Sequence, residues 1–319
     1  MKICHVVSAD PYKHLGGTPI VVKHLRKHMK SDYVYCRGKF FFIRGFIYPF
    51  IIAIWLVLKR YDIVVVHDQA GYGYSFVPKF MRGKMIAMCQ GVWTDFGEMV
   101  RLTRFQRVKT WFAIRMQRGM INRCEYVMAY CNYVRDRLIK DYGTDPAKIE
   151  VVYNGVDTKA FKSKVSRNKK IAIWVGDNPK LKNLDRTIEY TRKNKMRLLV
   201  VGVNGKNTQD IIYMDKVGHE KMPEVYNKAG TFVMFLDVSA PSLVLLEAMA
   251  CGLNIVTKET EILPPPKHGV CKVDGKLSRK IALKFDWKDV AERHLNIYKK
   301  VFEREQPKND DKIQHKNRI

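Results

Sequence analysis

Short runs rich in Val and Ile alternate with helical stretches along most of the chain, and this alternation restricts the fold more than any other feature. Such a pattern predicts βαβ units, whose strands lie parallel in a sheet covered by helices. A first set of strands is expected at Met1–Val7, Ile63–His67, Lys84–Cys89, Tyr126–Tyr130 and Ile149–Tyr153. A second set is expected at Ile171–Gly176, Arg197–Gly202, Thr231–Leu236 and Leu253–Thr257. The sequence therefore predicts an α/β protein with two sheets.

The stretch Asn154–Lys170 separates the two sets, has little periodicity and is typical of a linker. We expect an N-terminal Rossmann-like domain at 1–157 and a C-terminal one at 158–285. Residues 286–302 have helical periodicity and are expected to form a helix that returns to the N-terminal domain, followed by a polar tail at 303–319. Two facing Rossmann-like domains would place a ligand in the cleft between the carboxyl ends of their sheets.

The charge of the chain is strongly unbalanced, with 58 Lys and Arg against 31 Asp and Glu and a formal net charge of +27. This excess is spread over both halves and indicates an anionic partner. It is densest over 101–123, where no acid occurs. That block can be an interfacial helix on anionic lipid, a surface for nucleic-acid phosphates, or an amphipathic helix with a solvated basic face. The residues expected to form a membrane or anion surface are Arg104, Arg107, Trp111, Arg115 and Arg118.

The cysteines, the first residues and one apolar segment indicate in which cellular compartment the protein acts. The seven Cys are scattered without a C-x-x-C pair, so neither a disulfide framework nor a zinc site is expected, and no metal is predicted. The first residues enter a strand at once and leave no room for a signal peptide.

Phe40–Leu58 is nearly all apolar, but Arg44, Gly45 and Pro49 interrupt it, so we expect a buried helix on a sheet, or one that also dips into a bilayer interface. These features predict a cytoplasmic protein at the inner face of the membrane.

Glycines follow the first expected strand. Gly16 and Gly17 precede the apolar-periodic stretch Ile20–Met29, so a helix is expected to begin there. Glycines between a strand and a helix N-terminus let the backbone approach a phosphate or a sugar, although a tight turn needs the same residues. The pattern is neither G-x-G-x-x-G nor a P-loop.

Six segments then occur in an order that resembles the family-4 glycosyltransferases of the GT-B fold. They are GGT-x-I-V-V-x-x-L from Gly16, DIVVVHDQ, YVMAYCNYVRDRLIKDYGTDPAKIEVVYNGVD, WVGDNPKLKNLD, MPEVYNKAGTFVM and PSLVLLEAMACG. The resemblance extends from residue 1 to about residue 302. It implies two facing Rossmann-like domains, a UDP- or GDP-linked sugar donor held mainly by the C-terminal domain, and an acceptor held by the N-terminal one. It implies no cofactor.

The resemblance also assigns roles to residues. Glu247 would accept hydrogen bonds from the ribose hydroxyls of the nucleotide, which suits the two oxygens of a carboxylate. Lys182 would neutralise the diphosphate as it leaves. The remaining residues expected to bind the donor are Gly16, Gly17, Gly176, Lys180, Ser242, Leu243 and Val244.

Three positions depart from the family pattern. Ser239 stands where the family has the first Glu of its E-x7-E motif, and Gln90 stands where many members have a His. Asp177 occupies the place of an Arg that binds the diphosphate, and Lys180 is a candidate to replace that Arg. Lys182, Gln90 and Ser239 are expected to be the catalytic positions, while these departures leave the identity of the sugar open.

The resemblance implies a retaining, metal-independent hexosyltransferase, and with the basic and apolar segments it predicts action in lipid-linked or cell-surface glycan assembly at the cytoplasmic face of the membrane. Two alternatives remain. One is a glycosyltransferase that acts on nucleic acid, which would use the basic excess for phosphate contacts. The other is a non-catalytic protein that binds nucleotide sugars, as the departures at Asp177 and Ser239 would allow.

Overall fold

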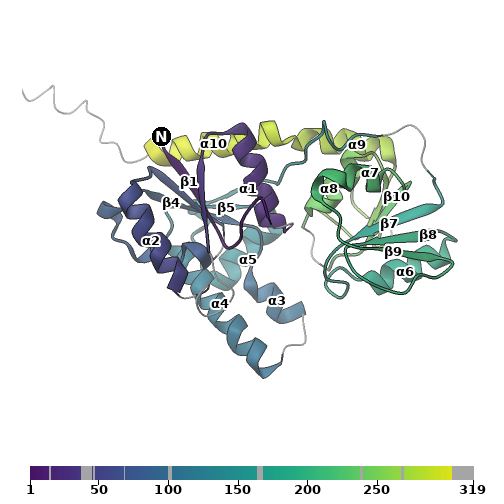
Figure 1. The fold of residues 1–319 in the computed structure, drawn as a ribbon, viewed down its shortest axis with the longest axis horizontal. Helices are drawn as coiled ribbons and strands as arrows, with labels where there is room; N and C mark the ends of the chain where they lie inside the picture. The colour runs from purple at the N-terminus through teal and green to yellow at the C-terminus, as the bar shows by residue number, and fades with distance from the viewer. Residues whose placement is uncertain are drawn as a thin grey trace, which may run out of the picture.

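The computed structural model describes residues 1–13, 16–36, 45, 47–67, 69–99, 103–163, 168–237, 240–266 and 269–303, without the side chains of residues 96 and 99. It contains two six-stranded sheets, each covered by helices (Figure 1). The chain has an α/β fold with two Rossmann-like domains, as the sequence predicted. A cleft lies between the domains.

The N-terminal sheet is parallel and has the strand order β2-β1-β3-β4-β5-β6. Its central strands are short and apolar because helices cover both faces, and every residue of Ile63–Val66 is completely buried. The strands are β1 Ile3–Val7, β2 Asp32–Tyr35, β3 Ile63–Val66, β4 Lys84–Cys89, β5 Tyr126–Ala129 and β6 Ile149–Val151. The α-helices are α1 Gly17–His28, α2 Tyr48–Lys59, α3 Trp93–Met99, α4 Arg104–Arg123 and α5 Asn132–Tyr142. Short 3₁₀ turns are η2 Gln69–Gly71, η3 Gly73–Phe76, η4 Lys79–Met81 and η5 Pro146–Lys148.

The C-terminal sheet has the order β12-β11-β10-β7-β8-β9, with only β12 antiparallel among the described strands. The strands are β7 Ile171–Val175, β8 Arg197–Val201, β9 Ile211–Met214, β10 Thr231–Met234, β11 Asn254–Thr257 and β12 Cys271–Val273. The helices are α6 Leu184–Lys193, α7 Met222–Tyr226, α8 Leu243–Ala250, α9 Gly275–Ala282 and α10 Trp287–Glu303, with 3₁₀ turns η6 His219–Lys221 and η7 Leu283–Phe285.

The sequence pattern did not predict β2, β9 or β12. Each of these strands lies at an edge of its sheet. An edge strand is partly open to solvent, so it does not need the continuous apolar run that marks a central strand. β2 illustrates the effect, because Asp32 is exposed and its other three residues are only half-buried.

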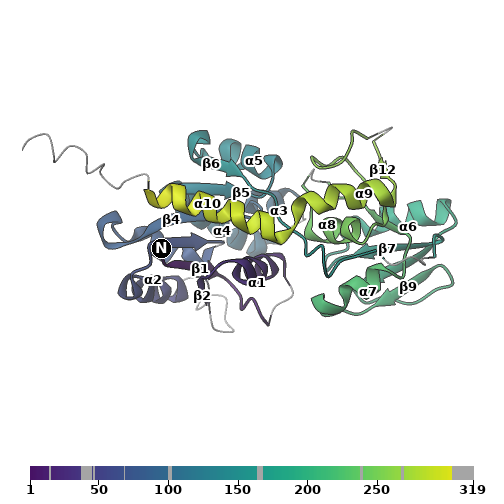
Figure 2. The ribbon, with the colours of Figure 1, turned by 90° about the horizontal axis from the view of Figure 1, so that it is seen from above.

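The last helix, α10, runs from the C-terminal domain back across the N-terminal domain (Figure 2). Its residues Trp287 and Tyr298 are buried in the same core as Ile3 and Ile63. The two chain crossings between the domains lie side by side, since Val156 donates a backbone hydrogen bond to Phe285 O at 2.8 Å. This pair of crossings is the covalent connection between the domains.

The segment Phe40–Leu58 is described only from Gly45 onward, without residue 46. Its helix, α2, buries Ile52 and Leu56 against the domain, and leaves Ile54 and Leu58 on the surface with exposed fractions of 63% and 76%. Part of the apolar run therefore packs as predicted, and the rest forms an apolar outer face. Within the described ranges, no helix is both long enough and apolar enough to cross a membrane.

Candidate functional site

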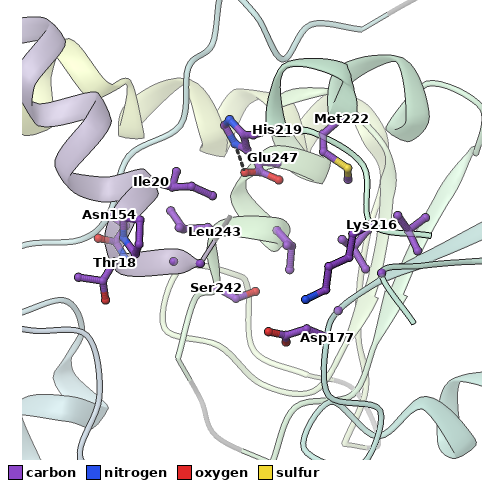
Figure 3. A pocket seen from close by; sticks show the side chains of 18 of the residues that line it. Thr18, Ile20, Asn154, Asp177, Lys216, His219, Met222, Ser242, Leu243 and Glu247 are labelled. Atoms are coloured by element: carbon purple, nitrogen blue, oxygen red, sulfur yellow. Dashed lines mark hydrogen bonds and ion pairs between the residues drawn. The ribbon is translucent and has the colours of Figure 1, made fainter. Parts of the chain in front are cut away.

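A cavity of about 710 Å³ lies in the cleft between the two domains (Figure 3). Its wall comes from the segments that follow β1, β4, β5 and β6 in the N-terminal domain and β7, β8 and β9 in the C-terminal domain, together with the N-terminal parts of α1 and α8. The cavity thus lies at the carboxyl ends of both sheets, where open α/β sheets bind their ligands.

Two helix N-termini meet at this cavity. α1 begins at Gly17 after an N-cap, Gly16, that has no side chain to satisfy the first backbone amides. α8 begins at Leu243 after Ser242, whose hydroxyl accepts a hydrogen bond from Leu245 N at 3.3 Å. A Cβ atom on Gly17 would lie 3.9 Å from Leu243 Cδ1, so the two helix starts approach each other closely. Unpaired amides and the positive ends of two helix dipoles favour an anion here.

Two glycines let the ends of β7 and β8 come together beneath the cavity. Gly202 has φ +99°, and a Cβ atom on it would lie 2.5 Å from Gly176 O. A Cβ atom on Gly176 would lie 2.6 Å from Lys182 Cδ, so the lysine stem crosses directly over this glycine. Larger residues would push the Lys182 ammonium away from its present place.

Two ammonium groups and one carboxylate face the same part of the cavity. Lys182 Nζ lies 3.5 Å from Asp177 Oδ1, and Lys216 points toward the same region in Figure 3. Burial acts to raise the pKa of Asp177, but Lys182, with help from Lys216, brings that pKa below its ordinary value. Lys180, proposed to replace the missing Arg, is exposed and does not line the cavity. Sequence reasoning missed Lys216, which lies in an irregular segment after β9 that carries no motif.

Glu247 is the buried acid of the site, with an exposed fraction of 5%. His219 Nε2 lies 2.8 Å from its Oε1, and Tyr226 donates its hydroxyl hydrogen to Oε2 at 2.9 Å. Burial, and then the neighbouring Glu247, raise the pKa of Tyr226 well above its usual range. The phenol therefore keeps its proton and donates it in the hydrogen bond to Glu247. His24 of α1 packs edge-on against His219, which links the acid to the N-terminal domain.

Gln90 lies on the opposite side of the site, at the end of β4. Its amide nitrogen donates to Asn154 Oδ1 at 3.1 Å, and Asn154 Nδ2 donates back to Gln90 Oε1 at 2.7 Å. This reciprocal pair fixes the orientation of both carboxamides. Gln90 and Tyr130 also line a second cavity of about 450 Å³ that opens beside the first.

Apart from Lys180, which is exposed outside the cavity wall, the predicted site residues fall into three groups. Those that line the main cavity are Gly16, Gly17, Gln90, Gly176, Lys182, Ser242, Leu243, Val244 and Glu247. Those on the exposed part of α4, outside the cavity wall, are Arg104, Arg107, Trp111, Arg115 and Arg118. Ser239 falls outside the described residues. In the part of the chain that the structure describes, no group of three or more His, Cys, Asp or Glu side chains is arranged to hold a metal ion.

Two family models match the chain in succession. Residues 7–160 match the model described as Glycosyltransferase Family 4, and residues 159–285 match the model described as Glycosyl transferases group 1. Together the two models extend over both domains. No curated protein matches the sequence.

Solved structures similar to this chain share its two-domain architecture. The sucrose-phosphate synthase from Thermosynechococcus elongatus has a TM-score of 0.74 and 14% identity, over 95% of this chain and 99% of that one. The Anabaena protein HepE in complex with UDP-glucose has a TM-score of 0.69 and 12% identity, over 94% and 100%. The lipopolysaccharide outer core galactosyltransferase WaaB, in its apo form, has a TM-score of 0.63 and 13% identity, over 94% and 100%.

Proposed function

The chain belongs to the family-4 glycosyltransferases of the GT-B fold, and from this premise we propose that it is a retaining, metal-independent hexosyltransferase that uses a UDP- or GDP-linked sugar. The observation that carries the proposal is the convergence of two helix N-termini, two ammonium groups and a buried carboxylate on one cavity. Each of these groups suits one part of a nucleoside diphosphate.

The donor would bind with its ribose hydroxyls at Glu247 and its diphosphate at the amides of Ser242, Leu243 and Val244. His219 and Tyr226 hold the carboxylate in place, and each carboxylate oxygen retains a further lone pair for a ribose hydroxyl. The sugar would then point toward Gln90. UDP and UDP-glucose bound to the structurally similar HepE support a nucleotide-sugar donor.

Catalysis would rest on charge stabilisation and positioning. The acceptor hydroxyl attacks the anomeric carbon on the face that the diphosphate leaves, the bond from that carbon to the phosphate oxygen breaks, and the hydroxyl proton passes to the leaving phosphate. No protein nucleophile is needed. Lys182 and Lys216 would stabilise the charge that grows on the diphosphate, and the lysines would exchange Asp177 for phosphate oxygens when the donor binds.

The acceptor is proposed to be lipid-linked or part of a cell-surface glycan, with the protein held at an anionic membrane. Support comes from α4, which projects from the N-terminal domain in Figure 1 and exposes Phe105, Trp111 and Phe112 among its arginines. The apolar outer face of α2 includes Phe50, whose ring stacks on Phe76, and the guanidinium of Arg123 at the end of α4 lies 4.6 Å from the centre of the Phe76 ring. A broad apolar surface beside basic residues fits a bilayer interface better than nucleic acid, where bases stack on single aromatic rings.

A screen of UDP- and GDP-sugars for thermal stabilisation tests the donor, followed by a transfer assay with NMR detection of the anomeric configuration. We expect one donor to raise the melting temperature and to be turned over with retention, with EDTA having no effect. Stabilisation without turnover would favour the non-catalytic binding protein, and inversion would exclude the proposed mechanism.

A further inference from the structure

The second cavity, beside the donor site, differs from it in chemistry. Its volume of about 450 Å³ is within the range of roughly 300–1,000 Å³ found for small-molecule sites. Trp93, Tyr130 and Tyr133 contribute half-buried aromatic rings to its wall, and Asp95 and Gln117 contribute polar atoms. No Lys or Arg lies in the described part of the wall, in a chain that has 58 of them.

The polar groups of this wall are held in fixed positions. Gln117 donates to Gly91 O at 3.0 Å and accepts from Trp93 N at 3.1 Å, so a side chain of α4 holds the segment that carries Trp93. Tyr133 donates its hydroxyl hydrogen to Asp95 Oδ1 at 2.8 Å, and Arg137 Nε lies 3.0 Å from the same oxygen. Arg137 does not line the cavity, so its ion pair with Asp95 lies outside the cavity wall and holds the carboxylate in place.

The chemistry of this wall excludes one class of ligand and favours another. A phosphate placed here would meet a carboxylate and no cation in the described wall, whereas the donor cavity offers Lys182 and Lys216. Aromatic faces accept the apolar C–H faces of ring-shaped molecules, and carboxylate oxygens accept hydrogen bonds from hydroxyl groups. These are the groups that a neutral sugar ring presents.

We propose that the second cavity is the acceptor subsite and that it takes the neutral sugar ring of a glycoside, not a phosphate group. Trp93 and Tyr133 stack on this ring, and Asp95 accepts hydrogen bonds from its hydroxyls. Gln90 lines both cavities, so the reacting hydroxyl meets the donor sugar at Gln90. This inference rests on the proposed transferase function, and it makes the acceptor a sugar already attached to its carrier.

The test uses the full chain saturated with UDP or GDP, whichever binds, and measures ligand binding by calorimetry and saturation-transfer NMR. The probes are methyl glycosides of glucose, galactose, mannose and N-acetylglucosamine, with the matching sugar 1-phosphates and an isoprenyl phosphate. We expect at least one methyl glycoside to bind at least ten times more tightly than every phosphate probe. Trp93→Ala and Asp95→Asn should each weaken that glycoside at least tenfold, while Trp93→Phe retains most of the affinity.

Matched controls are Phe80→Ala and Asp136→Asn, which change an exposed aromatic ring and an exposed acid elsewhere in the N-terminal domain. Both should bind the glycoside like the unchanged protein. Nucleotide affinity should stay the same in all variants, which also shows that they are folded. Tighter binding of a phosphate probe, or unchanged glycoside affinity in Trp93→Ala, would overturn the inference while nucleotide binding persists. If the protein without substitutions binds neither UDP nor GDP, that result would instead contradict the proposed transferase function.

Discussion

At the scale of single residues, the site depends on how its charged groups are held. Glu247 is buried, and a buried carboxylate is costly unless it is hydrogen-bonded. His219 and Tyr226 supply those bonds from the segment before α7 and from α7 itself. The orientation of the acid is therefore set before any nucleotide binds.

Glu247→Ala is expected to weaken nucleotide binding without unfolding the protein. Each hydrogen bond to a charged group contributes about 1.5–3 kcal/mol, so the Kd should rise by roughly one to two orders of magnitude for each bond lost. Isothermal calorimetry with UDP and GDP measures this, with the exposed Glu220→Ala as a control that leaves the Kd unchanged. An unaltered Kd in folded Glu247→Ala would remove this residue from the donor site.

Lys182→Ala and Lys216→Ala are expected to lower kcat more than they weaken donor binding. In the proposed mechanism negative charge on the diphosphate grows in the transition state, so the lysines would interact with it most strongly there. Steady-state kinetics with the donor found in the screen separate the two effects, and Lys228→Ala, an exposed lysine outside the cavity, is the matched control. Full activity of either variant at saturating donor would show that its ammonium has no catalytic role.

At the scale of secondary-structure elements, one helix is capped from the other domain. The N-cap of α5, Cys131, makes no side-chain capping bond. Instead Glu261 of the C-terminal domain accepts hydrogen bonds from Asn132 N at 2.9 Å and Tyr133 N at 2.8 Å, and the Tyr153 hydroxyl donates to it at 2.8 Å. A carboxylate at a helix N-terminus also interacts favourably with the helix dipole. The contact therefore stabilises the arrangement of the two domains in this structure.

Glu261→Ala is expected to lower the free energy of unfolding by about 0.5–2 kcal/mol, the usual effect of removing an N-cap. It should also open the cleft, because the cap bridges the domains. Urea titration and small-angle X-ray scattering measure the two effects, and the exposed Glu259→Ala serves as the control. A stability and radius of gyration equal to those of the unchanged protein would show that Glu261 does not hold the domains together.

The exposed part of α4 leads to a prediction about membranes. We expect binding to liposomes that contain anionic lipid and little binding to neutral ones. Each basic residue near the surface contributes about 1 kcal/mol, so removing four of them should abolish sedimentation with the liposomes. The four changes to Ser are made at Arg104, Arg107, Arg115 and Arg118. Tight binding of duplex DNA at physiological salt, without sedimentation on anionic liposomes, would instead favour the nucleic-acid alternative.

A control for this experiment removes the same number of charges elsewhere. Four exposed lysines of the C-terminal domain are changed to Ser, and liposome binding should persist if the position of the charge matters. The lysines are Lys193, Lys195, Lys206 and Lys284.

At the scale of the whole molecule, α10 fastens the end of the chain to the N-terminal domain and buries imidazoles there. His5 Nδ1 lies 2.9 Å from His67 Nε2, and His294 of α10 is completely buried close to them. Burial lowers the pKa of His5 and of His294 to about 3, and that of His67 well below its ordinary value. These rings are therefore neutral in the folded protein at any pH above that range.

The stability of the protein is expected to fall as the medium becomes acidic. In the unfolded chain each His takes up a proton near pH 6.5, whereas the folded chain resists protonation down to about pH 3. The stabilisation is thus complete above pH 6.5 and is lost between pH 6.5 and 3, at about 1.4 kcal/mol per pH unit for each His. Urea titrations at pH 7, 6 and 5 measure this slope.

His294→Phe should make the slope shallower by the contribution of one His, whereas His28→Gln, at an exposed position, should leave it unchanged. The same slope in the unchanged protein and His294→Phe would show that His294 does not cause the acid sensitivity.

The sequence by itself determined the features that depend on local pattern and motif order. The central strands, such as Lys84–Cys89, were predicted because a strand buried on both faces must be apolar throughout. Helix α6 was predicted at Leu184–Lys193, where it occurs. Gly16, Lys182 and Glu247 were chosen from motifs in a fixed order, and the structure brings them to one cavity.

Only the tertiary structure decided which groups complete the site. Lys216 and His219 lie in a segment without periodicity, and their position follows from how β9 and α7 are placed beside α8. Glu261 caps a helix that begins 129 residues earlier in the chain, and the second cavity combines residues of α3, α4 and α5. Contacts between residues so distant in sequence arise only when the two domains fold and pack, because no local propensity or spacing specifies them.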